Sequence, residues 1–335
     1  MTAAKRSVWV WAGHFKDEPT MVSLGLLGKA HEISQQLGDG EVVAVLAGTD
    51  SRNLVAELID HGADKVYLAN NPRPSSFEPE LCSDFMTRLI QEHQPEIVLW
   101  GATSLEREIA ARVAAKLGTG LTAHCMDLYI GEVKGEQQLV AVVAGWGGNL
   151  ALKIICPWKR PQMATVKPGI FLPPKPQKRS GEVIEVKVAD RPSRLELVEV
   201  VERQEEAGSL EQAETVVVGG WGLSSIDGLT AARELTQALG GATGGTRPAL
   251  DAGWITAERM VGQSGITIAP RLLVTLGVSG AAQFATGVLR SGFILAIDKN
   301  PNAPIFEMAD LGIVGDLKEV LPLLISKIRA IEEKN

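Results

Sequence analysis

Glycines, a lone arginine and small hydroxyl side chains gather in the second half of the chain, in an order that could hold an anion. The run GGTRPALDAG at 244–253 carries Arg247, VGQSG follows at 261–265, and GVSGAAQF comes at 277–284. Because glycine has no side chain and tolerates a positive φ, backbone can approach a ligand closely at these places. The pattern is typical of a cradle for the phosphates of a cofactor.

The elements around these runs would aim free backbone groups at such a ligand. Leu272 to Leu276 is an apolar run that predicts a strand, and Ser279-Gly280 would open the next helix. The N–H groups at a helix N-terminus lack intrahelical partners and attract anions. Ordinary helix capping by Ser279 is the alternative interpretation, and it would look identical in the sequence.

Strand-like and helix-like segments alternate along the first 120 residues. The predicted strands are 7–12, 41–47, 65–69 and 96–100, and the predicted helices are 19–37, 53–61, 79–93 and 105–117. Such alternation is typical of βαβ units and a parallel sheet. From Asp127 the rhythm changes, because 138–144 and 150–156 are strand-like with no helix between them. We therefore expect an antiparallel addition at the sheet edge.

A second strand–helix series begins at Val216. Its predicted strands are 216–218, 272–276 and 293–297, and its predicted helices are 228–239 and a last one opened by Asp316. A proline-rich stretch with a strand at 183–188, followed by an acidic stretch, separates the two series. We expect an N-terminal α/β domain at 1–195, a linker at 196–213 and a second domain at 214–335.

The composition excludes several classes of protein. The formal net charge is −7, which argues against a general nucleic-acid or anionic-membrane binder. No apolar stretch approaches the roughly 18–20 residues of a membrane span and no signal peptide is visible, so we expect a cytoplasmic protein without direct membrane insertion, or an organelle-matrix protein after loss of a transit peptide. Cys82, Cys125 and Cys156 have no paired spacing, which favours inert thiols over a disulfide or metal site.

The order of the motifs resembles the FAD domain of the alpha subunit of electron transfer flavoproteins. After the three runs above come IDKNPNAPIF at 297–306 and GIVGD at 312–316. The resemblance reaches the first half of the chain through GATS at 101–104, GTGLTA at 118–123 and RPQMATVKPG at 160–169. Several linked motifs in a fixed order are more specific than a single glycine pattern, and together they span nearly the whole chain.

The resemblance implies two α/β domains and a redox role. The first domain would be a parallel sheet with antiparallel edge additions, similar in fold to the beta subunit. The second would be a doubly wound, Rossmann-like FAD-binding domain with the cofactor at the carboxyl ends of its strands. The chain would be an electron carrier rather than a substrate-transforming enzyme, since FAD carries the redox chemistry. It would pair with the family's beta subunit and connect a flavin dehydrogenase, of acyl-CoA dehydrogenase type, with a membrane or soluble acceptor.

The resemblance also implies which residues of these motifs contact the cofactor. The resemblance puts the Arg247 guanidinium beside the flavin, where reduction adds negative charge. Ser264 would donate to flavin N5, Gln263 would meet the O4 side or a phosphate, and Asp298 and Asp316 would lie near the adenosine half. The full set of implied FAD contacts is Trp221, Arg247, Val261, Gly262, Gln263, Ser264, Ser279, Gly280, Ala281, Ala282, Gln283, Phe284, Asp298, Asp316 and Leu317.

Some of these residues could instead have a purely structural role, with no contact to a cofactor. Arg247 could be an ordinary surface arginine, since most arginines are exposed. VGQSG could be a simple turn, and Asp316 could cap the last helix.

Two positions depart from the family pattern. Trp221 stands where the family has an arginine in a Gly-Gly-Arg-Gly turn, and Phe284 stands where it usually has a histidine. Tryptophan cannot neutralise a phosphate, but it can stack on an aromatic ring. All five histidines precede the expected flavin domain, so that domain has no imidazole to share the charge of a reduced flavin: His14, His31, His61, His93 and His124.

Charged residues follow the GATS turn of the first domain. Glu106, Arg107, Glu108 and Arg112 come directly after a turn that resembles a nucleotide-binding loop. We expect these residues to form the solvated face of a helix rather than a second site.

Two other functions fit the residues less well. A nicotinamide-dependent oxidoreductase subunit could use the same sheet, but no G-x-G-x-x-G fingerprint follows a strand and no candidate base lies near the cradle. A non-redox nucleotide-binding or assembly protein is the third interpretation, which Trp221 and Phe284 leave open. A visible absorption spectrum and a nicotinamide turnover assay separate the three.

Overall fold

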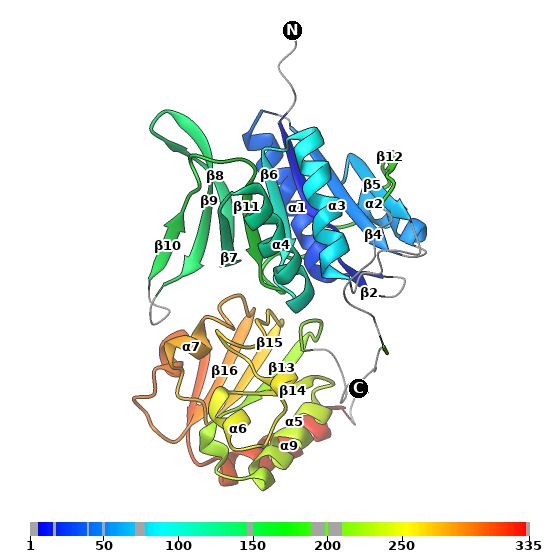
Figure 1. The fold of residues 1–335 in the computed structure, drawn as a ribbon. Coiled ribbons are helices and arrows are strands. Elements are labelled where there is room, and N and C mark those ends of the chain that lie inside the picture. Colours follow the sequence, from blue (N-terminus) through cyan, green and yellow to red (C-terminus); the bar gives the residue numbers. More distant parts are fainter. Residues whose placement is uncertain are drawn as a thin grey trace. The chain divides into compact units, whose positions relative to one another are not determined.

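The computed structural model describes residues 6–15, 18–38, 40–48, 51–70, 78–145, 150–188, 198–199 and 210–332. The chain divides into two compact units (Figure 1), one made of Met1–Ala144 and Ala151–Val201 and the other of Gly145–Leu150 and Glu202–Asn335. Each unit contains its own parallel sheet, so the expected pair of α/β domains is confirmed.

The first unit has a seven-stranded parallel sheet in the order β12-β5-β4-β1-β6-β11-β7. Its strands in chain order are β1 (Ser7–Trp11), β4 (Glu41–Gly48), β5 (Lys65–Asn70), β6 (Ile97–Gly101), β7 (Leu121–Cys125), β11 (Gln162–Val166) and β12 (Glu182–Glu185). The chain passes from β1 outward to β4 and β5, and then returns to place β6 on the other side of β1. The strand order therefore reverses between β1 and β6, which makes this the switch point of the sheet.

Helices cover both faces of this sheet. They are α1 (Met21–Gln36), α2 (Val55–Asp60) after a 3-10 turn at Ser51–Leu54, α3 (Pro79–His93) and α4 (Ser104–Leu117). Alternate residues of β1 face opposite sides: Val8 and Val10 share a core with α1 and α2, while Trp9 and Trp11 share one with α3 and α4.

The helices predicted at 79–93 and 105–117 are confirmed to within one residue. The second has clear start and stop signals in the sequence. The Thr103 hydroxyl accepts a hydrogen bond from the Glu106 amide, and Gly118 closes α4 at a φ of 63°.

The predicted antiparallel strands are confirmed, but they form a sheet of their own. It has the order β10-β9-β8, with β8 at Asp127–Val133, β9 at Glu136–Ala144 and β10 at Ala151–Ile154. Leu128, Leu139 and Ala141 bury their side chains in the core that α1 covers, so this small sheet packs on the unit rather than extending its parallel sheet. A short antiparallel pair, β2 (His14–Phe15) and β3 (Glu18–Pro19), follows β1.

The second unit has a five-stranded parallel sheet in the order β14-β13-β15-β16-β17. Its strands are β13 (Thr215–Gly219), β14 (Ala242–Gly245), β15 (Leu272–Leu276), β16 (Phe293–Asp298) and β17 (Leu311–Val314). Its helices are α5 (Ile226–Ala238), α6 (Arg247–Asp251), α7 (Ala282–Ala285), α8 (Ile305–Met308) and α9 (Leu317–Glu332), with 3-10 turns at Trp221–Leu223 and Ala257–Arg259. The strand order reverses between β13 and β15, so the expected doubly wound sheet is confirmed.

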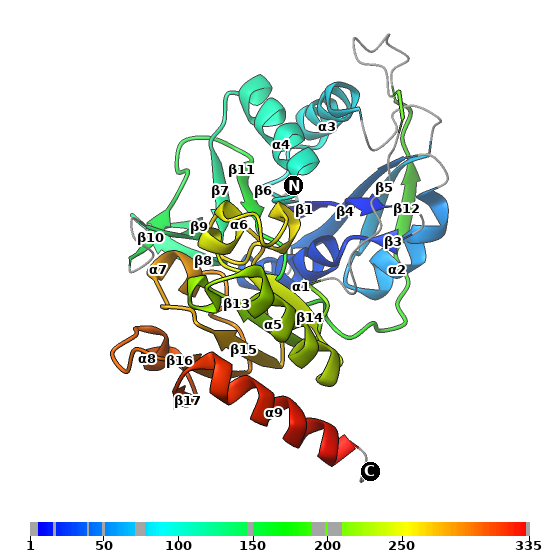
Figure 2. The same cartoon turned by 90° about the horizontal axis from the view of Figure 1, so that it is seen from below.

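The two faces of this sheet bury different helices. Val217 lies in a core that α5, α6 and α9 cover, and Figure 2 shows α9 running alongside α5. Val216 and Val218 lie in the opposite core, together with Phe284 of α7 and Ile305 of α8. The long helices α5 and α9 thus cover one face together with the short α6, and the short helices α7 and α8 cover the other.

Some elements of the described chain differ from those that the sequence predicts. The helix expected to open at Ser279-Gly280 begins at Ala282 and has four residues, because Gly280 takes a φ of 82° that no right-handed helix contains. Strands β7, β8 and β11 of the first unit and β14 and β17 of the second were not predicted. Most of the expected linker, residues 196–197 and 200–209, lies outside the described residues.

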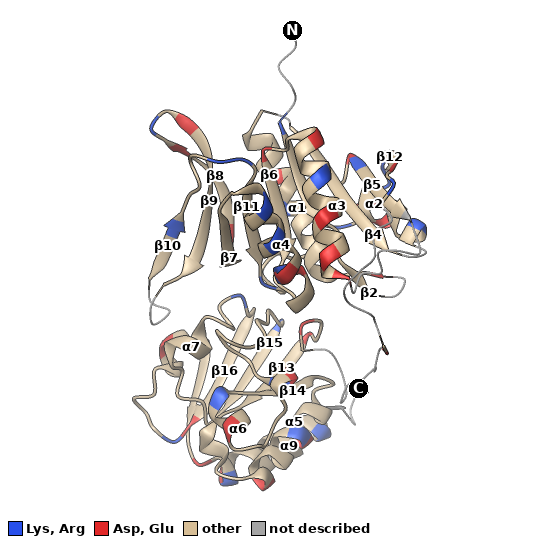
Figure 3. Cartoon of the chain, in the orientation of Figure 1, with Lys and Arg blue, Asp and Glu red and all other residues tan. Residues whose placement is uncertain are grey.

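Charged residues of both signs are interspersed along α3, α4, α5 and α9 (Figure 3). Among the helices that the structure describes, none has both the length and the apolar character needed to cross a membrane.

Candidate cofactor-binding site

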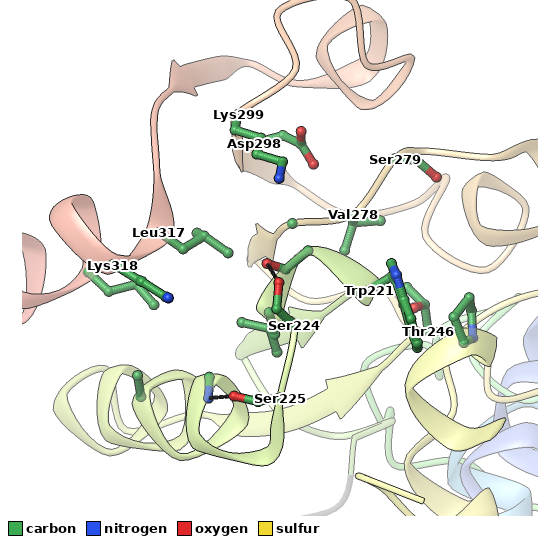
Figure 4. Close-up of a pocket in the computed structure, with 18 of the residues that line it drawn as sticks. Trp221, Ser224, Ser225, Thr246, Val278, Ser279, Asp298, Lys299, Leu317 and Lys318 are labelled. Atoms are coloured by element: carbon green, nitrogen blue, oxygen red, sulfur yellow. Dashed lines mark hydrogen bonds between the residues drawn. The ribbon is translucent and has the colours of Figure 1, made fainter. Parts of the chain in front are cut away.

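A pocket of about 1630 Å³ opens at the carboxyl end of the second unit's sheet (Figure 4). Residues that directly follow each of the five strands line it: Trp221 after β13, Thr246 after β14, Val278 and Ser279 after β15, Lys299 after β16, and Gly315 and Asp316 after β17. Its volume exceeds the roughly 300–1,000 Å³ of an ordinary small-molecule pocket and suits a dinucleotide.

Glycine backbones meet at the switch point beneath the pocket. A Cβ added at Gly220 would overlap the Gly277 carbonyl, and one added at Gly222 would lie 2.6 Å from the Gly277 Cα. The Gly220 amide donates to the Leu276 carbonyl and the Gly222 amide to the Gly277 carbonyl, both at 2.9 Å. The turns after β13 and β15 are therefore held together by backbone alone, which leaves the space above them to a ligand.

The turn after β15 supplies Ser279 and Gln283 to the pocket. Both side chains are exposed, so their polar groups are accessible to a ligand. Gly280 lies against the backbone of Ile305, where a Cβ would overlap the Ile305 amide. This turn keeps the polar groups that the sequence predicted, but in a tight loop rather than at the start of a long helix.

Arg247 is the first residue of α6 and is 63% exposed in its side chain. Its Nε donates to Asp251 Oδ1 at 2.7 Å, one turn further along α6. The Thr246 amide before it donates to the Gly219 carbonyl at 3.0 Å, which ties α6 to the end of β13. The pair with Asp251 holds the guanidinium at the pocket wall and leaves its other N–H groups for an anion.

The VGQSG loop lies against the turn that contains α7. The Gln263 amide donates to the Gln283 carbonyl at 2.7 Å, and Gly262, at a φ of 144°, meets the backbone of Gly287. Ser264 lines the pocket and is exposed. The loop is thus a fixed part of the wall and carries two side chains that can donate hydrogen bonds.

The two aromatic residues that depart from the family pattern have opposite surroundings. Phe284 lines the pocket but is only 6% exposed, because its ring packs in the core with Val261 and Val278. Trp221 is 63% exposed and stacks on Trp254, with ring centroids 5.4 Å apart and planes 12° apart. Phe284 is thus a wall of the pocket, whereas the indole of Trp221 is accessible.

Asp298 and Asp316 both turn a carboxylate oxygen toward local backbone. Asp298 Oδ1 accepts from the Asn300 amide and Asp316 Oδ1 from the Lys318 amide, each at 2.8 Å. Asp316 therefore caps α9 and lines the pocket at the same time. Their second carboxylate oxygens are the groups that could meet a ligand at this end.

The structure brings nearly all the predicted contacts to one pocket. Only Gly280 and Ala282 do not line it; Gly280 backs the turn and Ala282 begins α7. Sequence reasoning missed several polar lining residues, among them Ser224, Ser225, Thr246, Lys299 and Lys318. Thr246 and Lys299 are the first residues after β14 and β16, so the position after a strand end was the signal that could have found them.

The switch point of the first unit is closed by a side chain. Glu106 in the first turn of α4 is 3% exposed, and a Cβ added at Gly13 or at Gly101 would overlap its carboxylate. Glu106 Oε2 has no hydrogen-bond partner among the described residues. Burial raises the pKa of Glu106 to about 7, against the opposing hydrogen bond to Thr103. The expectation that Glu106 lies on a solvated helix face is therefore wrong, because α4 turns this residue inward beneath β1 and β6.

Two family models match the chain. The model described as "Electron transfer flavoprotein domain" matches residues 8–191, and the one described as "Electron transfer flavoprotein FAD-binding domain" matches residues 209–289. The second match contains most of the pocket wall, from the turn after β13 to the turn that holds Phe284.

Relatives that align with almost the whole chain are more than a third identical to it over the aligned residues. "Electron transfer flavoprotein subunit alpha" of Thermoanaerobacterium thermosaccharolyticum is 39% identical over 98% of this chain and 99% of its own length. "Lactate dehydrogenase (NAD(+),ferredoxin) subunit LctC" of Acetobacterium woodii is 36% identical over 98% of this chain and 78% of its own length. "Protein FixB" of Rhizobium meliloti is 36% identical over 95% of this chain and 92% of its own length.

Proposed function

The chain belongs to the family of electron transfer flavoprotein alpha subunits, and on this premise we propose that it holds FAD in the pocket of its second unit and passes electrons between a dehydrogenase and a downstream acceptor. The family resemblance that the order of the motifs indicated is confirmed, as are the FAD cofactor and the electron-transfer role. Bound FAD supplies the electron-accepting and electron-donating chemistry.

One observation carries the proposal: polar or glycine residues after all five parallel strands converge on a single pocket large enough for a dinucleotide. Parallel sheets bind ligands at the carboxyl ends of their strands, at the point where the strand order reverses. The glycines at that point let the turns after β13 and β15 lie in backbone contact beneath the pocket, and the polar residues that line it, such as Ser279 and Gln283, fit the phosphates of FAD.

The chain's own residues divide the work of binding. The turn at Ser279 and Gln283 would hold the phosphates and ribityl chain through hydroxyl, amide and backbone N–H groups. Arg247 would balance negative charge at the flavin end, and Gln263 and Ser264 would donate hydrogen bonds to the flavin edge. Asp298 at the end of β16 and Asp316 after β17 would contact the adenosine end.

We assign the beta subunit of the same family as the partner and a flavin dehydrogenase of acyl-CoA dehydrogenase type as the electron donor. The LctC relative is named as a subunit of a lactate dehydrogenase, which favours a 2-hydroxy acid dehydrogenase as the second candidate donor. Both donors would deliver electrons to the same FAD, so they can be compared in one assay.

The test is co-expression with the beta subunit, followed by an absorption spectrum and turnover assays with each dehydrogenase and an artificial acceptor. A yellow complex that is reduced by a dehydrogenase and its substrate supports the proposal. A colourless complex, or one that turns over nicotinamide without any dehydrogenase, would overturn it.

A further inference from the structure

We propose that the indole of Trp221 stacks on the flavin ring of the bound cofactor, as the outer member of a stack whose inner member is Trp254. The inference rests on the proposed FAD site. It gives this chain an aromatic contact at a position where the family pattern has an arginine.

The backbone fixes the position of Trp221. The residue follows β13 and lies between Gly220 and Gly222, whose amides donate to the carbonyls of Leu276 and Gly277 at 2.9 Å. Neither glycine could carry a Cβ without meeting Gly277. Because both neighbours of Trp221 are tied to the next strand, its Cα cannot move away from the pocket without breaking the switch point.

Trp254 supports one face of the indole. The two rings are nearly parallel, at 12°, with centroids 5.4 Å apart. Trp254 is partly buried against the core that contains Val217, and its amide donates to the Ala249 carbonyl at 3.0 Å. The inner indole is thus anchored in the fold and holds the outer one in place.

The outer indole has apolar surface for which the described residues provide no cover. Trp221 lines the pocket and yet is 63% exposed. A large aromatic group that faces a pocket and is already held in one orientation can bind a flat ring with little loss of conformational freedom. Parallel stacking in the existing pair would extend by one layer when such a ring arrives.

The position of Trp221 selects the flavin half of the cofactor over the adenosine half. Figure 4 shows Trp221 beside Thr246, the residue that precedes Arg247, whereas Leu317 and Lys318 lie on the far side of the pocket. The Thr246 amide donates to the Gly219 carbonyl at 3.0 Å, so the ends of β13 and β14 hold these residues as neighbours. Arg247 is the cation suited to a reduced flavin, and the ring beside it would be the isoalloxazine.

The experiment uses the alpha–beta complex stripped of flavin and titrated separately with FAD and with ADP, which carries only the adenosine end of the cofactor. Trp221→Ala should weaken FAD binding roughly tenfold or more, the effect of losing one stacked ring, and change ADP binding less than twofold. Trp221→Phe should retain most of the FAD affinity. Rebound FAD should fluoresce more strongly in Trp221→Ala than in the wild type, since the adjacent indole quenches it.

Trp158→Ala is the matched control, because Trp158 is 82% exposed and belongs to the first unit. It should leave both affinities and the flavin fluorescence unchanged. An unchanged FAD affinity in Trp221→Ala, or an equal loss for FAD and ADP, would overturn the stacking. If the wild-type complex binds no FAD, the proposed function itself fails. If the wild type binds FAD and Trp221→Ala binds it equally well, only the stacking fails.

Discussion

The two units place glycines at the switch points of their parallel sheets and use the space in opposite ways. In the first unit Gly13 and Gly101 make room for the buried carboxylate of Glu106. In the second, Gly220 and Gly277 bring two turns into backbone contact, and a pocket opens above them. The same topology therefore yields a crevice that the Glu106 side chain fills in one unit and a crevice that is open to a ligand in the other.

Replacing a glycine at the open switch point should have the largest effect. In Gly220→Val the new Cβ would overlap the backbone of Gly277, which cannot move aside as a flexible side chain would. We expect a loss of more than about 3 kcal/mol in the free energy of unfolding of the second unit, with loss of bound FAD. Denaturant unfolding and flavin content measure both.

Gly240→Asn is the control for this substitution. Gly240 has a φ of 61° and no neighbour within 4 Å of an added Cβ, and asparagine tolerates that conformation. It should keep FAD and most of the stability. Equal damage by both substitutions would mean that the contact with Gly277 is not what holds the pocket open.

The closed crevice should make the first unit sensitive to pH. The pKa of Glu106 is raised by burial from 4.5 to about 7, so the folded state binds a proton more tightly than the unfolded state. The contribution of Glu106 to the stability of the unit is then fully present below about pH 4.5 and is lost as the pH rises through about 7, a change of ~3 kcal/mol from this group.

Urea unfolding of the wild type and of Glu106→Gln at pH 5 and pH 8 checks this. The amide cannot ionise, so the wild type should lose more stability than the variant between the two pH values. Parallel behaviour of the two proteins would show that Glu106 does not titrate in this range.

A double-mutant cycle tests whether Glu106 is what fills the crevice. An added methyl at Gly13 would overlap the Glu106 carboxylate, with the Ser23 hydroxyl 3.6 Å away. Gly13→Ala should cost about 2 kcal/mol in the wild type and much less in a Glu106→Ala background, where the overlap is gone. If the stability losses of the two single substitutions simply add in the double variant, the Glu106 carboxylate does not lie against Gly13.

The same two regions show which features of the structure could be predicted from the sequence and which could not. The alternating strands and helices predicted two parallel sheets, and motif order predicted most of the pocket wall, because these signals are local. The burial of Glu106 could not be predicted in this way. Its local sequence, with Arg107 and Glu108 beside it, is typical of a solvated helix, and the space it occupies is created by Gly13, far away along the chain.

The two unpredicted strands of the second unit have a similar explanation. β14 reads ATGG and β17 reads LGIV, so each is short and contains glycine, which disfavours a strand by itself. β14 forms because it pairs with β13, and β17 because it pairs with β16. The Trp221–Trp254 stack likewise joins two turns that nothing in the sequence relates.

Arg247→Ala should have the smallest effect. The guanidinium is exposed and already paired with Asp251, so its interaction with a reduced flavin is screened. We expect the reduction potential of bound FAD to fall by about 20 mV for the two-electron couple, which corresponds to about 1 kcal/mol. Arg271→Ala is the control, because Arg271 precedes β15 at the opposite end of the sheet. Redox titration of the complex measures the potential. Equal shifts of the FAD reduction potential in the two variants would show that Arg247 does not lie at the flavin.

Hydrogen–deuterium exchange of the alpha–beta complex, with and without FAD, tests the central claim most directly. FAD should slow exchange in the turns that follow the strands of the second unit, at 219–223, 246–250, 261–265 and 277–284. Exchange around Gly13 and at 101–106 should not change, since Glu106 closes that crevice. Protection at the first unit's switch point, with none in the second unit's turns, would contradict the account.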